Sequence, residues 1–187
     1  MANRAIFLDR DGTVIIDKGY LYKISDLEFI PGSIQALKAL NDAGFKLLII
    51  SNQSGIARGM YTEEDYQSLT EAMLEQLSNR GVCIEDTYYC PHLPDAIVPQ
   101  YRQVCDCRKP ATGLFHRAVK EHDIDLDSSF AIGDRLRDLA ICSESDCQGI
   151  LIGTTEDENV ITSARTGVYP NITYEPDLLS AARSILG

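Results

Sequence analysis

Basic residues are scarce in this sequence. Among its 187 residues, 17 lysines and arginines stand against 28 aspartates and glutamates, so the formal net charge is −11. The phosphate backbone of a nucleic acid would be repelled by such a chain, which argues against a nucleic-acid partner. An anionic small molecule can still bind if a metal ion and a few cations are concentrated at one site.

Long hydrophobic runs are also missing. No apolar stretch approaches the roughly 20 residues that a membrane-spanning helix needs, so we expect no membrane partner. The first four residues lead directly into an apolar segment and leave no room for a signal peptide, so we expect a cytoplasmic protein. No repeat, low-complexity tract or linker divides the chain. We therefore expect a single domain over residues 1–187 and a monomer.

Short apolar segments alternate with helical patterns along the chain. Strands are predicted at 5–8, 46–50, 86–89, 130–132 and 149–152. Helices are predicted at 33–41, 62–77, 114–122 and 177–186. This alternation predicts an α/β fold with a mainly parallel sheet flanked by helices. Residues 14–30 are expected to form a hairpin-like flap over the strand ends.

Two aspartates stand two residues apart where the first strand is expected to end. Asp9 and Asp11 follow the apolar segment 5–8, and Gly12 permits a tight turn around a small anion. Ligands bind at this edge of open α/β sheets. The pattern predicts a nucleophile and a proton carrier that share one metal ion. The alternative is a polar strand exit without chemistry.

Three further polar motifs follow later strands in the same order. Residues 51–55, Ser-Asn-Gln-Ser-Gly, offer hydroxyl, amide and backbone donors to phosphate oxygens. Residues 108–110, Arg-Lys-Pro, supply fixed positive charge before a helix, and Asp134 and Asp138 add two carboxylates. Each motif has an ordinary alternative: a turn, a solvated helix entry and a helix cap. Their consistent placement at strand ends predicts that they converge on one site.

Four of the cysteine and histidine side chains form two close pairs. Cys90 and His92 form one pair, and Cys105 and Cys107 the other. Three thiolates and one imidazole make a closed zinc site, so we expect a structural Zn²⁺ that stabilises the loop 90–107. Zinc would then fix the segment that carries the neighbouring cations. The alternative is that these are ordinary core cysteines.

The remaining cysteines and histidines lack such spacing. Cys83, Cys142 and Cys147 are expected to be buried thiols. His116 and His122 lie on a predicted helix, where surface or packing positions are expected.

Together the four strand-end motifs resemble those of the haloacid dehalogenase (HAD) superfamily of phosphatases, over essentially the whole chain. The resemblance implies a Rossmannoid sheet and an aspartyl-phosphate mechanism, with Asp9 as nucleophile and Asp11 as general acid and base. It implies a Mg²⁺ ion held by the Asp9 carboxylate, the Asp11 carbonyl oxygen and Asp134, with Asp138 farther out. Ser51 and Lys109 would hold the phosphoryl oxygens.

No large cap domain is expected. After a helix and a strand are subtracted, the interval between Asp11 and Ser51 is too short for one, and the interval to Lys109 holds none either. Short elements must therefore select the substrate, which suits a small phosphosugar.

Within the superfamily, three segments closely resemble the bacterial D-glycero-D-manno-heptose 1,7-bisphosphate 7-phosphatases. They are Cys-Pro-His at 90–92, Cys-Asp-Cys-Arg-Lys-Pro at 105–110 and the run 51–59. The resemblance implies removal of the C7 phosphate, to give heptose 1-phosphate for lipopolysaccharide precursor synthesis. Histidinol-phosphate phosphatase is an alternative, although its zinc loop is typically shorter. A sugar-phosphate-binding protein without activity is a second alternative. Against it stands the presence of all four expected catalytic residues: Asp9, Asp11, Lys109 and Asp134.

The same resemblance implies a set of substrate contacts. They are Asp17, Lys18, Gly19, Tyr20, Ser51, Asn52, Gln53, Ser54, Arg108, Lys109 and Arg135. A guanidinium group matches phosphate bidentately, so Arg108 and Arg135 are expected to bind the second, non-transferred phosphate. The alternative for Arg135 is a surface salt bridge.

Overall fold

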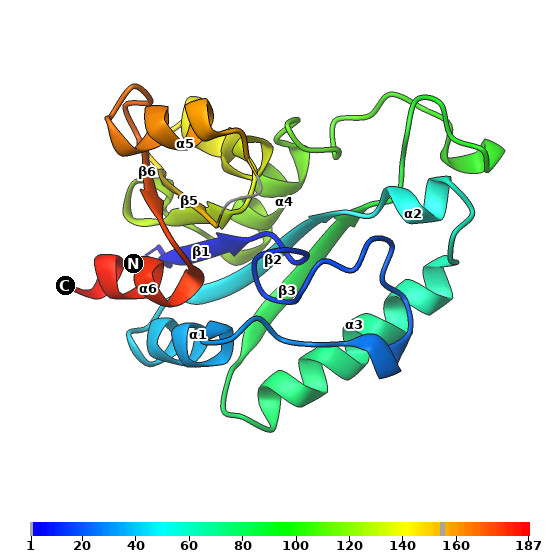
Figure 1. Cartoon of the computed structure of the whole chain (residues 1–187), viewed down its shortest axis with the longest axis horizontal. Coiled ribbons are helices and arrows are strands. Elements are labelled where there is room, and N and C mark those ends of the chain that lie inside the picture. The colour runs from blue at the N-terminus through cyan, green and yellow to red at the C-terminus, as the bar shows by residue number, and fades with distance from the viewer. Residues whose placement is uncertain (1, 154–155) are drawn as a thin grey trace.

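The computed structural model describes residues 2–153 and 156–187 (Figure 1). Its sheet contains β1 (Ala5–Leu8), β2 (Lys46–Asn52), β3 (Ile84–Cys90), β4 (Phe130–Gly133), β5 (Gln148–Ile152) and β6 (Ile172–Glu175). All neighbouring strands are parallel, in the order β3-β2-β1-β4-β5-β6. The order therefore reverses between β1 and β4, and ligands of open α/β sheets bind beyond the strand ends at such a switch point.

Helices cover both faces of the sheet (Figure 1). One face carries α1 (Ser33–Asp42), α3 (Glu63–Ser78) and α6 (Leu178–Leu186). The other carries α4 (Gly113–His122), η4 (Leu136–Ser143) and α5 (Glu158–Arg165). Short helical turns complete the described elements: η1 (Ile24–Asp26), α2 (Ser54–Ala57), η2 (Pro99–Tyr101) and η3 (Leu126–Ser128).

The apolar segment of β1 supplies both layers of the core. Ile6 and Leu8 pack on the side of α1 and α6, whereas Phe7 packs on the opposite side against Phe115 of α4, with ring centroids 5.5 Å apart. Successive strand side chains point to opposite faces, and a strand covered on both faces must be apolar throughout. This explains why β1 is a continuous hydrophobic run that ends abruptly at Asp9.

Capping side chains set the starts of two helices. Thr62 accepts a hydrogen bond from the Asp65 N–H at 3.1 Å, and Asp65 accepts one from the Thr62 N–H at 2.9 Å. Asp177 caps α6 by accepting from the Ser180 N–H at 2.7 Å. The predicted helices at 62–77 and 177–186 are confirmed, each beginning one residue later because its first residue is the cap.

The other predicted strands and helices are confirmed with small shifts at their ends, but β6, α5 and α2 were missed. The four residues of β6 at the sheet edge are partly buried except for the exposed Thr173, and α5 is flanked by polar sequence. Neither element therefore has the apolar run on which the prediction relied. None of the described helices combines the length and apolar character needed to span a bilayer.

The flap 14–30 is closed by antiparallel pairing near its two ends. The Ile16 N–H donates to Glu28 O at 2.9 Å, and the Ile30 N–H donates to Val14 O at 3.1 Å. The hairpin-like form predicted for 14–30 is therefore confirmed.

One prediction about the isolated cysteines was wrong. Cys142 and Cys147 are buried as expected, but Cys83 is exposed. It lies in the turn between α3 and β3, where its backbone N–H donates to Asn41 Oδ1 and its side chain is left at the surface. His116 and His122 lie on α4, as predicted; His116 is exposed, and His122 packs against Tyr88.

Candidate active site

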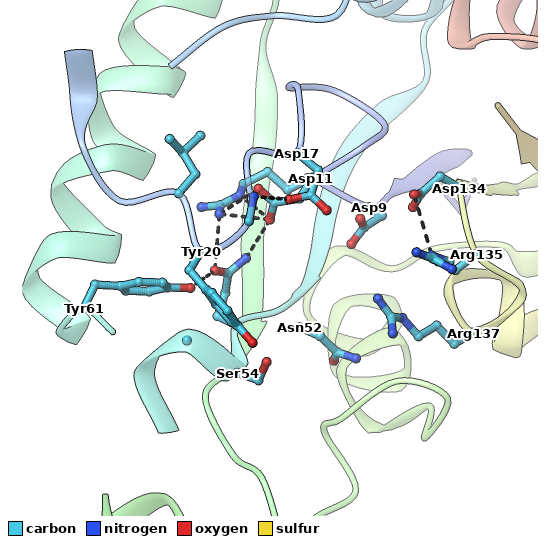
Figure 2. A pocket seen from close by; sticks show the side chains of 15 residues that line it. Asp9, Asp11, Asp17, Tyr20, Asn52, Ser54, Tyr61, Asp134, Arg135 and Arg137 are labelled. Carbon is cyan, nitrogen blue, oxygen red and sulfur yellow. Dashed lines mark hydrogen bonds and ion pairs between the residues drawn. The ribbon is translucent and has the colours of Figure 1, made fainter. Parts of the chain in front are cut away.

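A cavity of about 350 Å³ lies where the polar segments leave the carboxyl ends of β1, β2 and β4 (Figure 2). Its lining includes Asp9, Asp11, Asn52, Gln53, Asp134 and Arg135, together with part of the flap. The ends of β1 and β4 are joined directly, because the Asp9 N–H donates to Ile132 O at 3.1 Å. The predicted convergence of the strand-end motifs is therefore observed, in a space suited to a small molecule.

A buried lysine lies beneath this cavity. Lys109 Nζ is 2.7 Å from Asp9 Oδ1, 2.7 Å from Asp138 Oδ1 and 2.6 Å from the Ile50 carbonyl oxygen. Burial favours the neutral amine, but the carboxylates of Asp9 and Asp138 outweigh it and raise the pKa of Lys109 above its ordinary value. The side chain therefore remains a cation within the protein.

Asn52 holds the backbone that carries this lysine. Its Oδ1 accepts from the Lys109 N–H at 3.0 Å, and its Nδ2 donates to the Lys109 carbonyl oxygen at 3.0 Å. This paired contact fastens the segment after β2 to the segment before α4, so the position of Lys109 does not depend on its own side chain alone.

Three carboxylates gather beside the lysine. Oxygens of Asp9, Asp134 and Asp138 lie within 4.8 Å of one another, and the Asp134 carboxylate packs so closely on Gly12 that a Cβ there would lie 2.6 Å from Oδ2. Burial, together with the charge of Asp9, raises the pKa of Asp138 to about 6 despite its contact with Lys109. Clustered hard oxygens with excess negative charge fit a divalent cation such as Mg²⁺.

Asp11 has a different environment from Asp9. Its carboxylate turns toward Arg10, with Nε 3.0 Å from Oδ2 and Nη2 3.1 Å from Oδ1, and Gln53 Nε2 donates to Oδ2 at 3.0 Å. Burial and the nearby Asp9 raise the pKa of Asp11 even though Arg10 opposes this. Among the described residues, the cluster of carboxylates that could hold a metal ion does not include the Asp11 side chain.

A second cluster joins the two cysteine-containing segments. The sulfurs of Cys90 and Cys107 are 3.1 Å apart, Cys105 Sγ is 3.2 Å from Cys107 Sγ, and His92 Nδ1 is 3.2 Å from Cys107 Sγ. The four ligand atoms lie within 4.8 Å of one another, as the spacing predicted. A set of three thiolates and one imidazole is typical of structural zinc sites.

The structure brings most of the sequence-predicted substrate contacts to the cavity. Its walls include Asp17, Gly19, Tyr20, Asn52, Gln53, Ser54 and Arg135. Ser51 and Lys109 are buried beneath it.

Lys18 and Arg108 do not line this cavity. Lys18 Nζ is 3.0 Å from Glu28 Oε2 and donates to the Asp26 carbonyl oxygen at 2.9 Å, so it closes the flap. Arg108 lines a separate hollow beside the cysteine loop, and its Nη1 approaches the His92 carbonyl oxygen at 3.4 Å. The expectation that both contact the contents of the cavity is therefore not supported by their placement.

Three polar side chains that line the cavity were not singled out from the sequence. Arg10 and Arg137 lie inside motifs that were recognised for their aspartates, so a search for cations in the same motifs would have found them. Figure 2 shows the guanidinium groups of Arg135 and Arg137 on the same side of the cavity as Asp134. Tyr61 carries no local signal, because it reaches the cavity only through the turn made by α2.

Comparisons with known proteins agree with this geometry. The family described as HAD-hydrolase-like matches residues 106–174. A D-glycero-beta-D-manno-heptose-1,7-bisphosphate 7-phosphatase from Photorhabdus laumondii is 50% identical over 72% of this chain and 72% of its own length, and the protein of that name from Escherichia coli K12 is 48% identical over 72% and 71%.

A solved structure is similar over nearly the full length. The crystal structure of D,D-heptose 1,7-bisphosphate phosphatase from B. bronchiseptica, complexed with magnesium and phosphate, superimposes with a TM-score of 0.81 at 30% identity. The alignment covers 98% of each chain.

We predict that Mg²⁺ stabilises the protein more at about pH 7.5 than at about pH 5. Because the pKa of Asp138 is raised to about 6, the metal-free folded state retains a proton that the unfolded chain loses from about pH 4 upward, so its stability falls as the pH rises through this window. Metal binding requires ionised carboxylates. At 100 times the dissociation constant, Mg²⁺ should add about 3 kcal/mol near neutral pH.

Thermal unfolding with MgCl₂, against NaCl of equal ionic strength, measures this difference. The Asp134→Asn variant should lose most of the Mg²⁺ effect. An equal shift in the unfolding midpoint at both pH values would contradict the prediction.

Proposed function

The chain belongs to the D-glycero-beta-D-manno-heptose-1,7-bisphosphate 7-phosphatase family, and from this we propose that it removes the C7 phosphate of the heptose bisphosphate by way of an aspartyl phosphate on Asp9. The observation that most supports this chemistry is the Asp9 carboxylate at the sheet switch point, held at 2.7 Å by a buried lysine beside two further carboxylates. The product would be heptose 1-phosphate, made in the cytoplasm for lipopolysaccharide precursor synthesis.

In the first step Asp9 attacks the phosphorus of the C7 phosphate. Lys109 binds one oxygen of the Asp9 carboxylate, Oδ1, which fixes the group so that the other oxygen can attack. The new bond joins this oxygen to phosphorus as the bond between phosphorus and the C7 oxygen breaks. Ser51, buried below the cavity, would donate its hydroxyl to the phosphoryl group.

Asp11 moves the proton in both steps. In its protonated form it transfers a proton to the departing C7 oxygen, and the raised pKa favours that form. The resulting carboxylate then takes a proton from water as the water oxygen attacks phosphorus. Inorganic phosphate leaves and the Asp9 carboxylate is regenerated, so atoms and charges balance over the cycle.

Asp9, Asp134 and the carbonyl oxygen of Asp11 would hold Mg²⁺, with Asp138 behind them against Lys109. Bound Mg²⁺ supplies positive charge that stabilises the phosphoryl oxygens in the transition state. The cluster of Cys90, His92, Cys105 and Cys107 would hold a structural Zn²⁺.

Two guanidinium groups favour a substrate with a second phosphate. Arg135 and Arg137 both line the cavity, with side chains 39% and 50% exposed, so they can reach an anionic ligand without being uncovered first. Arg137 is therefore a second candidate for this contact beside Arg135, whereas Arg108 lies outside this cavity. A bidentate contact with phosphate matches the planar guanidinium fork.

We predict that Asp9→Asn lowers phosphate release about 10³-fold or more, because an amide cannot form the covalent intermediate. Asp42→Asn, a surface substitution on α1, should leave the rate unchanged. The assay is steady-state phosphate release from both anomers of the heptose bisphosphate and from histidinol phosphate. A kcat/KM advantage for histidinol phosphate would overturn the substrate assignment, and an active Asp9→Asn protein would overturn the mechanism.

Arg137→Gln is predicted to raise KM for the bisphosphate about tenfold while kcat changes little, because the second phosphate loses a cation. KM for a sugar monophosphate should move by less than about twofold. Arg117→Gln, an exposed arginine on α4, is the matched control. Equal changes in KM for both substrates would exclude a contact with the second phosphate.

Loss of zinc is predicted to lower turnover roughly 10–100-fold, because Cys107 lies two residues before Lys109. The measurement is activity after chelation, with zinc content determined by elemental analysis and Mg²⁺ restored. Cys107→Ser should reproduce the loss, whereas Cys83→Ser, at an exposed cysteine outside the cluster, should not. Full activity after verified loss of zinc would contradict this coupling.

A further inference from the structure

Gln53 uses all four hydrogen-bonding positions of its side-chain amide. Its nitrogen donates to Asp11 Oδ2 at 3.0 Å and to Ser51 Oγ at 2.6 Å. Its oxygen accepts from Arg10 Nη2 at 3.2 Å and from the Tyr61 hydroxyl at 2.5 Å. The residue is 2% exposed, and a primary amide has two donors and two acceptor positions. Every hydrogen-bonding position of the Gln53 amide is therefore occupied. The residue links Asp11 and Ser51, two groups of the proposed mechanism.

The chemistry of the neighbours fixes which way this amide points. A guanidinium can only donate and an ionised carboxylate can only accept, so the oxygen must face Arg10 and the nitrogen must face Asp11. In the reversed orientation the amide NH₂ would face the donors of Arg10, and the amide oxygen would face the carboxylate of Asp11. Both groups are buried, so leaving them without hydrogen bonds would destabilise the folded protein. The Tyr61 hydroxyl adds the second donor to the oxygen side.

Tyr61 is held firmly enough to serve as that donor. Its ring covers Gly55 so closely that a Cβ on the glycine would lie 2.2 Å from a ring carbon, and Tyr22 of the flap stacks on it with centroids 5.9 Å apart. Burial raises the pKa of Tyr61 above its ordinary value, so the hydroxyl keeps its proton. The side chain is 7% exposed.

Gln53 and Arg10 donate more hydrogen bonds to one carboxylate oxygen of Asp11 than to the other. Oδ2 receives both Gln53 Nε2 and Arg10 Nε at 3.0 Å, whereas Oδ1 receives only the longer contact of 3.1 Å from Arg10 Nη2. Gln53 and Arg10 together therefore hold the Asp11 carboxyl chiefly through Oδ2.

We propose that Tyr61 is a positioning residue for the general acid: its hydroxyl fixes the Gln53 amide, which, with Arg10, orients the Asp11 carboxyl. This proposal rests on the proposed function, because it requires Asp11 to protonate the leaving oxygen. Tyr61 acts through Gln53, with no contact to a reacting atom required.

The test separates acid catalysis from general damage by the choice of leaving group. An alkoxide must be protonated as it departs, whereas a nitrophenolate leaves readily without help, and kcat/KM reports the steps up to that departure. Tyr61→Phe should lower kcat/KM for the heptose bisphosphate about tenfold, mainly through kcat, and for p-nitrophenyl phosphate less than about twofold. Tyr88→Phe, which removes a hydroxyl bonded to Glu121, should change neither.

A double-mutant cycle tests whether Tyr61 acts through Gln53. Gln53→Met should give the same leaving-group selectivity with a larger loss, and adding Tyr61→Phe to it should cause no further loss. Thermal unfolding checks that each variant is folded. If Gln53→Met does not fold, the leaving-group comparison with Tyr61→Phe alone decides the question.

Each outcome has a distinct meaning. Equal losses on both substrates, additive losses in the cycle or no loss at all would overturn the positioning role while leaving the phosphatase assignment intact. Failure of the wild-type protein to hydrolyse the heptose bisphosphate would refute the proposed function. The comparison then uses another alkyl phosphate that the protein hydrolyses, and the absence of any alkyl phosphatase activity would overturn both proposals.

Discussion

The contact on which the site depends is the buried ammonium of Lys109 between the carboxylates of Asp9 and Asp138, at 2.7 Å from each. Buried charges destabilise a protein unless each is matched, and removing one partner leaves the other uncompensated. The surrounding structure therefore fixes this lysine from several directions. Asn52 binds its backbone on both sides of the residue, and the loop with the cysteine cluster ends two residues before it.

Two aspartates in one short motif acquire different chemistry from different neighbours. Asp9 is held by a lysine at the sheet switch point, whereas Asp11 is turned toward Arg10 and Gln53 and has a raised pKa. Directly after the two aspartates, Gly12 with φ of 85° makes the tight turn by which the chain leaves the strand end. Two carboxyl groups in one site can serve as nucleophile and acid when their different environments shift their pKa values apart.

Sequence reasoning succeeded where function follows from chain topology. Parallel strands place their carboxyl ends at one edge, so Asp9, Asn52 and Asp134 could be brought together from the order of the motifs alone. Side-chain direction could not be predicted in this way: Lys18 and Arg108 lie in the expected segments, but they contact Glu28 and the His92 carbonyl oxygen and do not line the cavity. Tyr61 could not be found either, because its contact with Gln53 exists only after α2 has formed its turn.

The buried charges of this site favour a divalent metal ion. Arg10 is already paired with Asp11, and Lys109 with Asp9 and Asp138. With Asp134 added, and all three carboxylates of the cluster ionised, the buried ammonium balances one of three negative charges. Arg135 and Arg137 lie 3.9 Å from Asp134 and Asp138, but their side chains are 39% and 50% exposed, so solvent weakens their compensation of the other two. A divalent cation would neutralise the remaining negative charge, which would let an anionic phosphate approach the anionic Asp9 carboxylate. The net negative charge of the chain is therefore compatible with an anionic substrate, because the carboxylate charge around Asp9 would be balanced locally by cations.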